Sequence, residues 1–311
     1  MQSYAFIFPG QGSQHAGMGR ELAENFKVAA QSFEEADDAL GFALSRLCFE
    51  GPEEQLKLTA NTQPAILAAS IAAWRVLRDE SPLAPAFLAG HSLGEYSALV
   101  ASGALSFADA LRTVRARGSF MQEAVPVGVG AMAAILGVEA EILLEICHEA
   151  AQGEVVSPAN YNSPGQIVIA GHTGAVARVI EIAKARGFRK TMLLPVSAPF
   201  HCALMRPAAE RLSGALDAVQ VGALATPVVT NVEAKPNGDA ARVKGLLVEQ
   251  VCSPVLWDAS VQQMTAAGVT RFVEIGPGKV LAGLVKRIDK EVQTFNVQDS
   301  AGVKAITGGA L

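Results

Sequence analysis

A serine lies at the centre of the run Gly90-His91-Ser92-Leu93-Gly94. The pattern Gly-x-Ser-x-Gly is typical of a nucleophile elbow, a strained strand-to-helix turn that lifts the serine hydroxyl above a sheet. An apolar run over 86–89 predicts a strand directly before it, and helical spacing resumes over 95–102. This context favours Ser92 as a nucleophile over a residue of an ordinary turn. The N-terminus of the following helix would help to stabilise an oxyanion.

A serine nucleophile needs a general base at neutral pH. The chain has five histidines: His15, His91, His148, His172 and His201. His148 and His172 lie within residues 128–200, which are predicted below to form an inserted unit, and solvated or capping roles are the default expectation for them. The ring of His91 should point away from the neighbouring serine. His201 lies where the chain returns from that unit to the core, and clefts form at such junctions. The residues alone leave open whether His201 is the base or a surface residue, and no Asp or Glu stands out as its partner.

Arg117 falls at the edge of the apolar stripe of a helix predicted over 107–124. A guanidinium buried there without a partner would be strongly destabilising. It could pair with an internal carboxylate or extend to solvent. Alternatively, the substrate could supply the carboxylate, held by two parallel hydrogen bonds. The residues alone do not decide between these explanations.

Gln11 lies in the run Pro9-Gly10-Gln11-Gly12, directly after a strand predicted over 4–8. Glycines there would let backbone N–H groups approach a developing oxyanion. The run does not match a nucleotide-binding loop, because His15 replaces the third glycine of the dinucleotide motif and no Gly-Lys-Ser/Thr follows.

The elements that must position these residues fall into two groups. Helices and strands alternate in the first and last parts of the chain, which indicates a parallel sheet covered on both faces. Residues 128–200 show the order strand, helix, strand, strand, helix, strand, which is typical of a ferredoxin-like unit. We therefore expect an α/β fold with a parallel-sheet core over 1–126 and 202–311 and a ferredoxin-like (βαββαβ) subdomain inserted over 127–201. Further strands are predicted over 131–136, 155–160, 166–170, 190–196, 227–232 and 271–275, and further helices from about 20, over 63–79, 139–151 and 173–186, and after 278.

The composition narrows the class of protein. Half of the 311 residues are apolar and 18% are charged, which suits a folded globular chain. A net charge of -5 argues against a nucleic-acid binder. The four cysteines form no Cys-x-x-Cys pair, so we expect neither a metal site nor a disulfide framework. No signal peptide and no run of ~20 apolar residues is evident, so we expect a cytoplasmic protein without a membrane partner.

Several motifs, in this order along the chain, resemble the malonyl-CoA:acyl carrier protein transacylases of fatty acid and polyketide synthesis. They are Gly10-Gln11-Gly12-Ser13-Gln14, Gly90-His91-Ser92-Leu93-Gly94-Glu95-Tyr96, Arg117, Asn160-Tyr161-Asn162, Ala198-Pro199-Phe200-His201 and Glu274-Ile275-Gly276-Pro277-Gly278. The resemblance runs from about residue 4 to about 299. It implies an α/β-hydrolase-like core with the ferredoxin-like insertion, in agreement with the order of elements.

The resemblance also implies a catalytic centre. Ser92 would be the nucleophile, with His201 as its general base. The backbone carbonyl of Gln250, rather than an acid, would orient the imidazole. The backbone N–H groups of Gln11 and Leu93 would form the oxyanion hole.

The implied substrate site is centred on Arg117, which would hold the malonyl carboxylate. Five further side chains would line it: His91, Met121, Asn160, Asn162 and Phe200. Phe200 and Leu93 look like the malonyl-selecting forms of their motifs and would crowd an α-methyl group. Such crowding is worth only ~1–3 kcal/mol, so methylmalonyl should be a poor substrate rather than an excluded one.

The implied reaction moves a malonyl group from malonyl-CoA to the phosphopantetheine thiol of holo-acyl carrier protein through a malonyl-Ser92 ester, with ping-pong kinetics. Coenzyme A would enter as the substrate thioester, and no permanently bound cofactor is expected. One alternative is a serine hydrolase or thioesterase acting on acyl thioesters, which would need an acidic triad member and no Arg117. A second is a non-catalytic module that binds the carrier protein.

The sequence says less about the oligomeric state and about where a carrier protein would dock. We expect a monomer, because no apolar face is left over once both domains are packed. Two basic clusters could meet an acidic carrier protein or could be solvated helix ends: Lys184, Arg186, Arg189 and Lys190, and Lys286 with Arg287.

Overall fold

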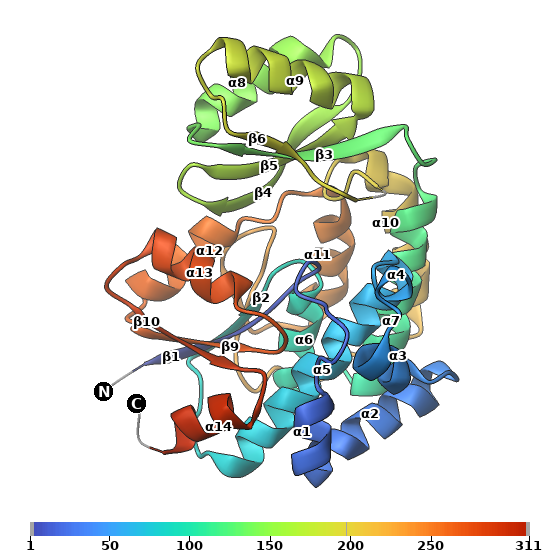
Figure 1. Ribbon diagram of the computed structural model, residues 1–311, viewed down its shortest axis with the longest axis vertical. Helices are drawn as coiled ribbons and strands as arrows, with labels where there is room; N and C mark the ends of the chain where they lie inside the picture. The colour runs from blue at the N-terminus through green and yellow to red at the C-terminus, as the bar shows by residue number, and fades with distance from the viewer. Residues whose placement is uncertain (1–2, 197, 309–311) are drawn as a thin grey trace.

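Two β-sheets organise the fold (Figure 1). The computed structural model describes residues 3–196 and 198–308. The larger sheet has the order β10-β9-β1-β2-β7-β8, in which β10 to β7 run parallel and β8 is antiparallel to β7. Its strands are β1 (Tyr4–Phe8), β2 (Phe87–Gly90), β7 (Val228–Val229), β8 (Pro236–Asn237), β9 (Arg271–Ile275) and β10 (Gln293–Val297). The parallel sheet expected from the sequence is present.

Strand β1 lies inside the larger sheet and is buried along its whole length. Phe6 and Phe8 pack into one apolar core and Ala5 and Ile7 into another, so both faces of the sheet are covered. Phe8 is level with Gly90 in the neighbouring β2. The loops that follow the two strands therefore emerge side by side, at the carboxyl edge where parallel sheets bind ligands.

Helices pack around this sheet (Figure 1). They are α1 (Arg20–Asn25), α2 (Lys27–Leu40), α3 (Leu44–Glu50), α4 (Glu53–Leu56), α5 (Thr59–Glu80), α6 (Gly94–Ala101), α7 (Phe107–Glu123), the short 3₁₀ helix η1 (Ala203–Met205), α10 (Arg206–Asp217), α11 (Ala240–Cys252), α12 (Trp257–Ala266), α13 (Val280–Ile288) and α14 (Ser300–Thr307). Helix α5 begins four residues earlier than expected, with Pro64 inside it. Proline cannot bond the carbonyl of Ala60, and Arg115 Nη1 donates to that oxygen instead at 3.4 Å.

The smaller sheet is antiparallel, with the order β4-β5-β3-β6. It consists of β3 (Gly130–Leu136), β4 (Val156–Ser163), β5 (Gln166–His172) and β6 (Thr191–Leu193), with α8 (Ala140–Ala151) and α9 (Thr173–Ala185). The chain order is the predicted one, but two expected strands are shorter. The strand expected over 190–196 ends at Leu193. In the larger sheet, the strand expected over 227–232 ends at Val229, because the N–H of Thr230 turns to bond the carbonyl of Lys235.

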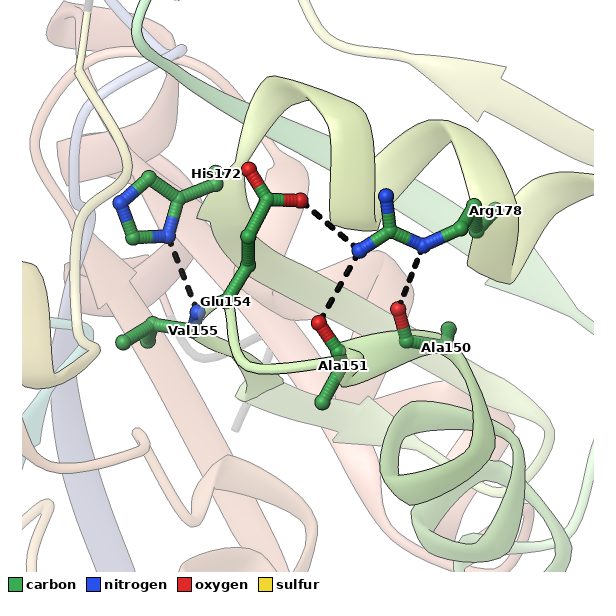
Figure 2. Close-up of polar contacts among 6 residues, drawn as sticks. All are labelled: Ala150, Ala151, Glu154, Val155, His172 and Arg178. Carbon is green, nitrogen blue, oxygen red and sulfur yellow. Dashed lines mark hydrogen bonds and ion pairs between the residues drawn. The ribbon is translucent and has the colours of Figure 1, made fainter.

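Arg178 ties the two helices of the smaller sheet together (Figure 2). Its Nε donates to the carbonyl of Ala150 at 2.7 Å, and its Nη2 donates to the carbonyl of Ala151 at 3.0 Å and to Glu154 Oε2 at 2.7 Å. These carbonyls belong to the last turn of α8, where intrahelical donors run out. The guanidinium on α9 therefore caps α8 and holds the pair together.

No helix in the described part of the chain is long and apolar enough to cross a bilayer.

Candidate active site

The turn between β2 and α6 has the strain expected of a nucleophile elbow. Ser92 has a φ of 50°, a left-handed conformation that costs a non-glycine residue ~1–2 kcal/mol. A Cβ at Gly90 would lie 2.0 Å from the carbonyl of Gly94, and a Cβ at Gly94 would lie 2.1 Å from the carbonyl oxygen of Phe8. Both glycines of the motif are therefore needed for the turn to pack on itself and on β1.

Ser92 and His201 face each other, although 109 positions separate them in the sequence. Ser92 Oγ lies 2.8 Å from His201 Nε2, and His201 Nδ1 lies 2.9 Å from the backbone carbonyl oxygen of Gln250. A carbonyl can only accept, so Nδ1 carries the ring proton and Nε2 offers a lone pair to the serine. Burial, reinforced by the charge of Arg117, lowers the pKa of His201 to about 3. The imidazole is therefore neutral at pH 7 and able to accept a proton.

Arg117 enters the same site from α7 and is 1% exposed. Its Nη1 donates to Gln63 Oε1 at 2.8 Å, and its Nη2 donates to Gln250 Oε1 at 2.9 Å and to Ser92 Oγ at 3.0 Å. No carboxylate forms an ion pair with it anywhere in residues 3–196 and 198–308. Of the explanations left open by the sequence, the internal salt bridge and the solvent-reaching side chain are both wrong.

A buried polar network that the sequence did not reveal lies beneath the elbow. Asn231 Oδ1 accepts from the N–H of Ser92 at 2.7 Å, and Asn231 Nδ2 donates to the carbonyl of Gly90 at 2.7 Å. Glu95 Oε2 accepts from the Asn231 N–H at 3.0 Å and from Gln250 Nε2 at 2.8 Å. Burial raises the pKa of Glu95 to about 7, against the lowering effect of these hydrogen bonds and of the nearby guanidinium. The network fixes the peptide groups on both sides of His91, within the elbow.

Gln250 contributes more than the backbone carbonyl expected of it. Its side-chain Nε2 also donates to the carbonyl of Ser92 at 3.0 Å, while its Oε1 accepts from Arg117.

The sequence could have indicated one member of this network, Glu95. It belongs to the serine motif, and a carboxylate among apolar neighbours in a predicted helix suggests a buried polar contact. Asn231 carried no such signal, because nothing in its local sequence distinguishes it.

A cavity of about 130 Å³ opens onto the serine. It is lined by Gln11, Gln63, His91, Ser92, Leu93, Arg117, Met121, Met132, Asn160, Leu194, Val196, Phe200 and His201. Gln63, Met132, Leu194 and Val196 were missed by the sequence analysis, and the last three complete an apolar wall with Met121 and Phe200. A larger hollow of about 550 Å³ beside α3, α4 and α7 contains none of the predicted site residues, so we place the chemistry in the smaller cavity.

Of the side chains expected to line the substrate site, His91 lies on the cavity and Asn162 does not. His91 lines the cavity together with Ser92, and its Nε2 lies 2.8 Å from Asn162 Oδ1. Burial lowers the pKa of His91. Asn162 is not among the cavity-lining residues, so its contact with the site runs through the His91 ring.

The two backbone N–H groups predicted for an oxyanion hole lie on the paired loops after β1 and β2. Neither the N–H of Gln11 nor that of Leu93 donates to another group of the described residues. The loops approach closely, because a Cβ at Gly10 would lie 2.5 Å from the carbonyl oxygen of His91. Glycine at this position thus lets the two loops approach each other, and Gln11 and Leu93 both line the cavity.

The histidines of the smaller sheet lie outside the cavity. His172 precedes α9, and its Nδ1 accepts from the N–H of Val155 at 2.9 Å (Figure 2). His148 lies in α8. The structural roles expected for this pair are consistent with these positions.

The two basic clusters are largely engaged in contacts within the chain. Lys184 pairs with Glu181, and Arg186 pairs with Glu145 and Glu149. Lys286 donates to the carbonyl of Val292 and Arg287 to Gln166. Arg189 and Lys190 are exposed and form no side-chain ion pair within the described residues.

Comparisons with known proteins give matches over almost the whole chain. The model of the acyl transferase domain family matches residues 5–307. The malonyl CoA-acyl carrier protein transacylase of Salmonella typhimurium is 49% identical over 305 residues, which cover 98% of this chain and 99% of the relative. The structure of the malonyl CoA-acyl carrier protein transacylase from Coxiella burnetii superimposes with a TM-score of 0.97 at 42% identity, over 99% of this chain and 97% of that one. A malonyl-transacylase solved with its type II polyketide acyl carrier protein gives a TM-score of 0.96 at 48% identity, with 99% of both chains covered.

Proposed function

The chain belongs to the malonyl CoA-acyl carrier protein transacylases of the acyl transferase family, and on this premise we propose that it moves the malonyl group through an ester on Ser92. The observation that carries the proposal is the chain of contacts from the serine hydroxyl to the neutral His201 ring and on to the Gln250 carbonyl. A hydroxyl positioned in this way can be deprotonated as it attacks a thioester.

In the first half-reaction, Ser92 Oγ attacks the thioester carbonyl of malonyl-CoA while His201 Nε2 takes its proton. The N–H groups of Gln11 and Leu93 stabilise the oxyanion of the tetrahedral intermediate. The imidazolium then gives its proton to the coenzyme A sulfur as the C–S bond breaks. The serine ester and free coenzyme A remain.

In the second half-reaction, His201 takes the proton of the carrier-protein pantetheine thiol as the sulfur attacks the ester. The C–O bond breaks, and Ser92 regains its proton from the imidazolium. Because coenzyme A and the carrier protein use the site in turn, the kinetics should be ping-pong. The apolar wall of the cavity would limit the access of water to the ester.

Arg117 is the proposed clamp for the malonyl carboxylate. Its burial without a carboxylate partner supports this role, because an anionic acyl group would supply the missing charge. The carboxylate would take over the Nη2 donor that now contacts Ser92 Oγ. Phe200 and Leu93, which line the cavity, would disfavour a methylmalonyl group.

We further propose that the larger sheet is an α/β-hydrolase-like core and that 127–201 form a ferredoxin-like subdomain. The order β4-β5-β3-β6, with two helices packed on the sheet, supports the second assignment. Coenzyme A would enter as a substrate, with no permanently bound cofactor, and holo-acyl carrier protein would be the acceptor. We propose a monomer in the cytoplasm.

Mass spectrometry after mixing with malonyl-CoA tests the ester. We expect one malonyl group on Ser92, its transfer on addition of holo-carrier protein, and no labelling of Ser92→Ala. Rapid release of malonate without transfer would instead indicate a hydrolase. The absence of any covalent adduct would indicate a binding module. The use of a backbone carbonyl in place of a triad acid already argues against the hydrolase.

A further inference from the structure

We propose that Gln63 is a specificity-determining residue: its neutral amide holds the guanidinium of Arg117 in place without neutralising it, so the charge is kept for the carboxylate of the acyl group. This inference rests on the proposed role of Arg117 as the clamp. Gln63 lies in α5, is 2% exposed and lines the cavity. Its Oε1 accepts from Arg117 Nη1 at 2.8 Å.

The contact depends on a close crossing of two helices. A Cβ at Gly118 would lie 2.6 Å from the carbonyl oxygen of Thr59 in α5, so only glycine lets α7 approach to this distance. Arg117, which directly precedes Gly118 on α7, is thereby brought against the Gln63 side chain. Met121, one turn further along, contacts the same amide: Gln63 Nε2 lies 3.8 Å from its Sδ. The amide is therefore held at both ends, with its oxygen towards the guanidinium.

The groups that contact the Arg117 guanidinium are all uncharged. Two amide oxygens, from Gln63 and Gln250, and the Ser92 hydroxyl accept from its amino groups, and the ring of Tyr96 lies 5.5 Å away. All of these partners orient a cation, but none carries a full negative charge. The acidic side chain nearest in the network, Glu95, contacts the far side of the Gln250 amide. A carboxylate at position 63 would differ from the present amide by little except its charge, and it would pair with the guanidinium directly.

The substitution Gln63→Glu tests the inference, because it keeps the size of the side chain and adds the charge. We expect kcat/KM for malonyl-CoA to fall about 100-fold, the scale of a lost hydrogen bond to a charged partner. The value for acetyl-CoA, which has no carboxylate, should stay within about threefold of the wild-type value. Thermal unfolding of the variant checks that the fold is kept.

Two further variants make the outcome decisive. Gln63→Met removes one of the acceptors that orient Arg117 but adds no charge. Because Gln250 Oε1 still accepts from the guanidinium, the malonyl-over-acetyl preference should fall by no more than about fivefold. Arg117→Ala should abolish that preference by lowering malonyl transfer far more than acetyl transfer. If Gln63→Glu keeps the preference while Arg117→Ala loses it, the inference is wrong and the clamp stands. If Gln63→Met loses the preference as fully as Gln63→Glu, charge is not the cause and the inference is also wrong. If Arg117→Ala keeps the preference, both the clamp and the inference are wrong.

Discussion

At the scale of single residues, His201 is a base whose charge state is governed by burial. Its pKa is lowered from the ordinary value of 6.5 to about 3, mainly by desolvation and then by Arg117. A lowered pKa means that the neutral, proton-accepting form dominates at every pH above about 3. The imidazole should therefore add no acidic limb near pH 6.5 to the rate of serine acylation.

The rate of coenzyme A release in a single turnover, measured between about pH 5 and 8, checks this expectation. Glu95 could contribute a limb of its own, since its pKa is raised to about 7. The same pH series measured on the Glu95→Gln variant separates the titration of Glu95 from that of His201. A limb with a midpoint near 6.5 that persists in Glu95→Gln would contradict the assignment to a buried neutral His201.

Asn231 is the second residue with a testable role, since it bonds the peptide groups on both sides of His91. Asn231→Ala leaves the N–H of Ser92 and the carbonyl of Gly90 without this partner. We expect the free energy of unfolding to fall by about 2–3 kcal/mol and kcat to fall at least about tenfold with little change in KM. Urea unfolding and steady-state kinetics measure both effects.

A matched substitution elsewhere shows whether the effect on kcat is specific. Asn237→Ala removes another buried asparagine, whose Nδ2 donates to the carbonyl of Asp239 away from the elbow. It should lower stability and leave kcat unchanged. Similar losses of kcat in both variants would show that Asn231 acts through general stability alone.

At the scale of elements, the crossing of α5 and α7 is what places Arg117 in the site. Gly118→Ala puts a Cβ 2.6 Å from the carbonyl oxygen of Thr59, so the helices must separate. We expect a destabilisation of about 1–3 kcal/mol and a larger loss of malonyl than of acetyl transfer. Thermal unfolding and the ratio of the two transfer rates measure the effect.

Gly214, inside α10, is the control for this substitution. A Cβ there meets no atom within 4 Å, so Gly214→Ala should stabilise the protein by up to about 1 kcal/mol through helix propensity. Its malonyl-to-acetyl ratio should not change. If Gly118→Ala also leaves that ratio unchanged, the helix crossing does not govern the clamp.

At the scale of the whole molecule, two buried carboxyl groups tie stability to pH. The pKa values of Glu95 and Glu274 are both raised by burial from 4.5 to about 7. Between these values the folded protein binds more protons than the unfolded chain. The contribution of each group to stability is therefore greatest below pH 4.5 and is lost as the pH rises through about 7.

Glu274→Gln isolates this effect outside the active site. Glu274 accepts from the N–H groups of Leu281 and Ala282 at the start of α13. Thermal unfolding from about pH 5 to 8 should show a smaller decline for this variant than for the wild type. Glu50→Gln, which removes an exposed carboxylate, should leave the decline as it is. An unchanged decline in Glu274→Gln would show that this carboxyl is not responsible.

Local chain properties predicted much of the fold. Alternating helices and strands predicted the parallel sheet, and the element order over 128–200 matched the smaller sheet. Element ends were less predictable, because they depend on distant partners: Arg115 bonds the carbonyl freed by Pro64, and Lys235 draws Thr230 out of β7. The cavity wall was similarly hidden, since Met132 and Leu194 resemble ordinary apolar residues of the smaller sheet.

The sequence by itself determined the type of chemistry, because a serine between two glycines at a strand-to-helix turn is a local pattern. Its resemblance to a family supplied the roles of His201 and Arg117. Only the tertiary structure decided which groups act on them. Asn231 and the Gln250 side chain reach the elbow, and Gln63 reaches Arg117, from distant parts of the chain. A hydrogen bond depends on distance and direction rather than on spacing along the sequence.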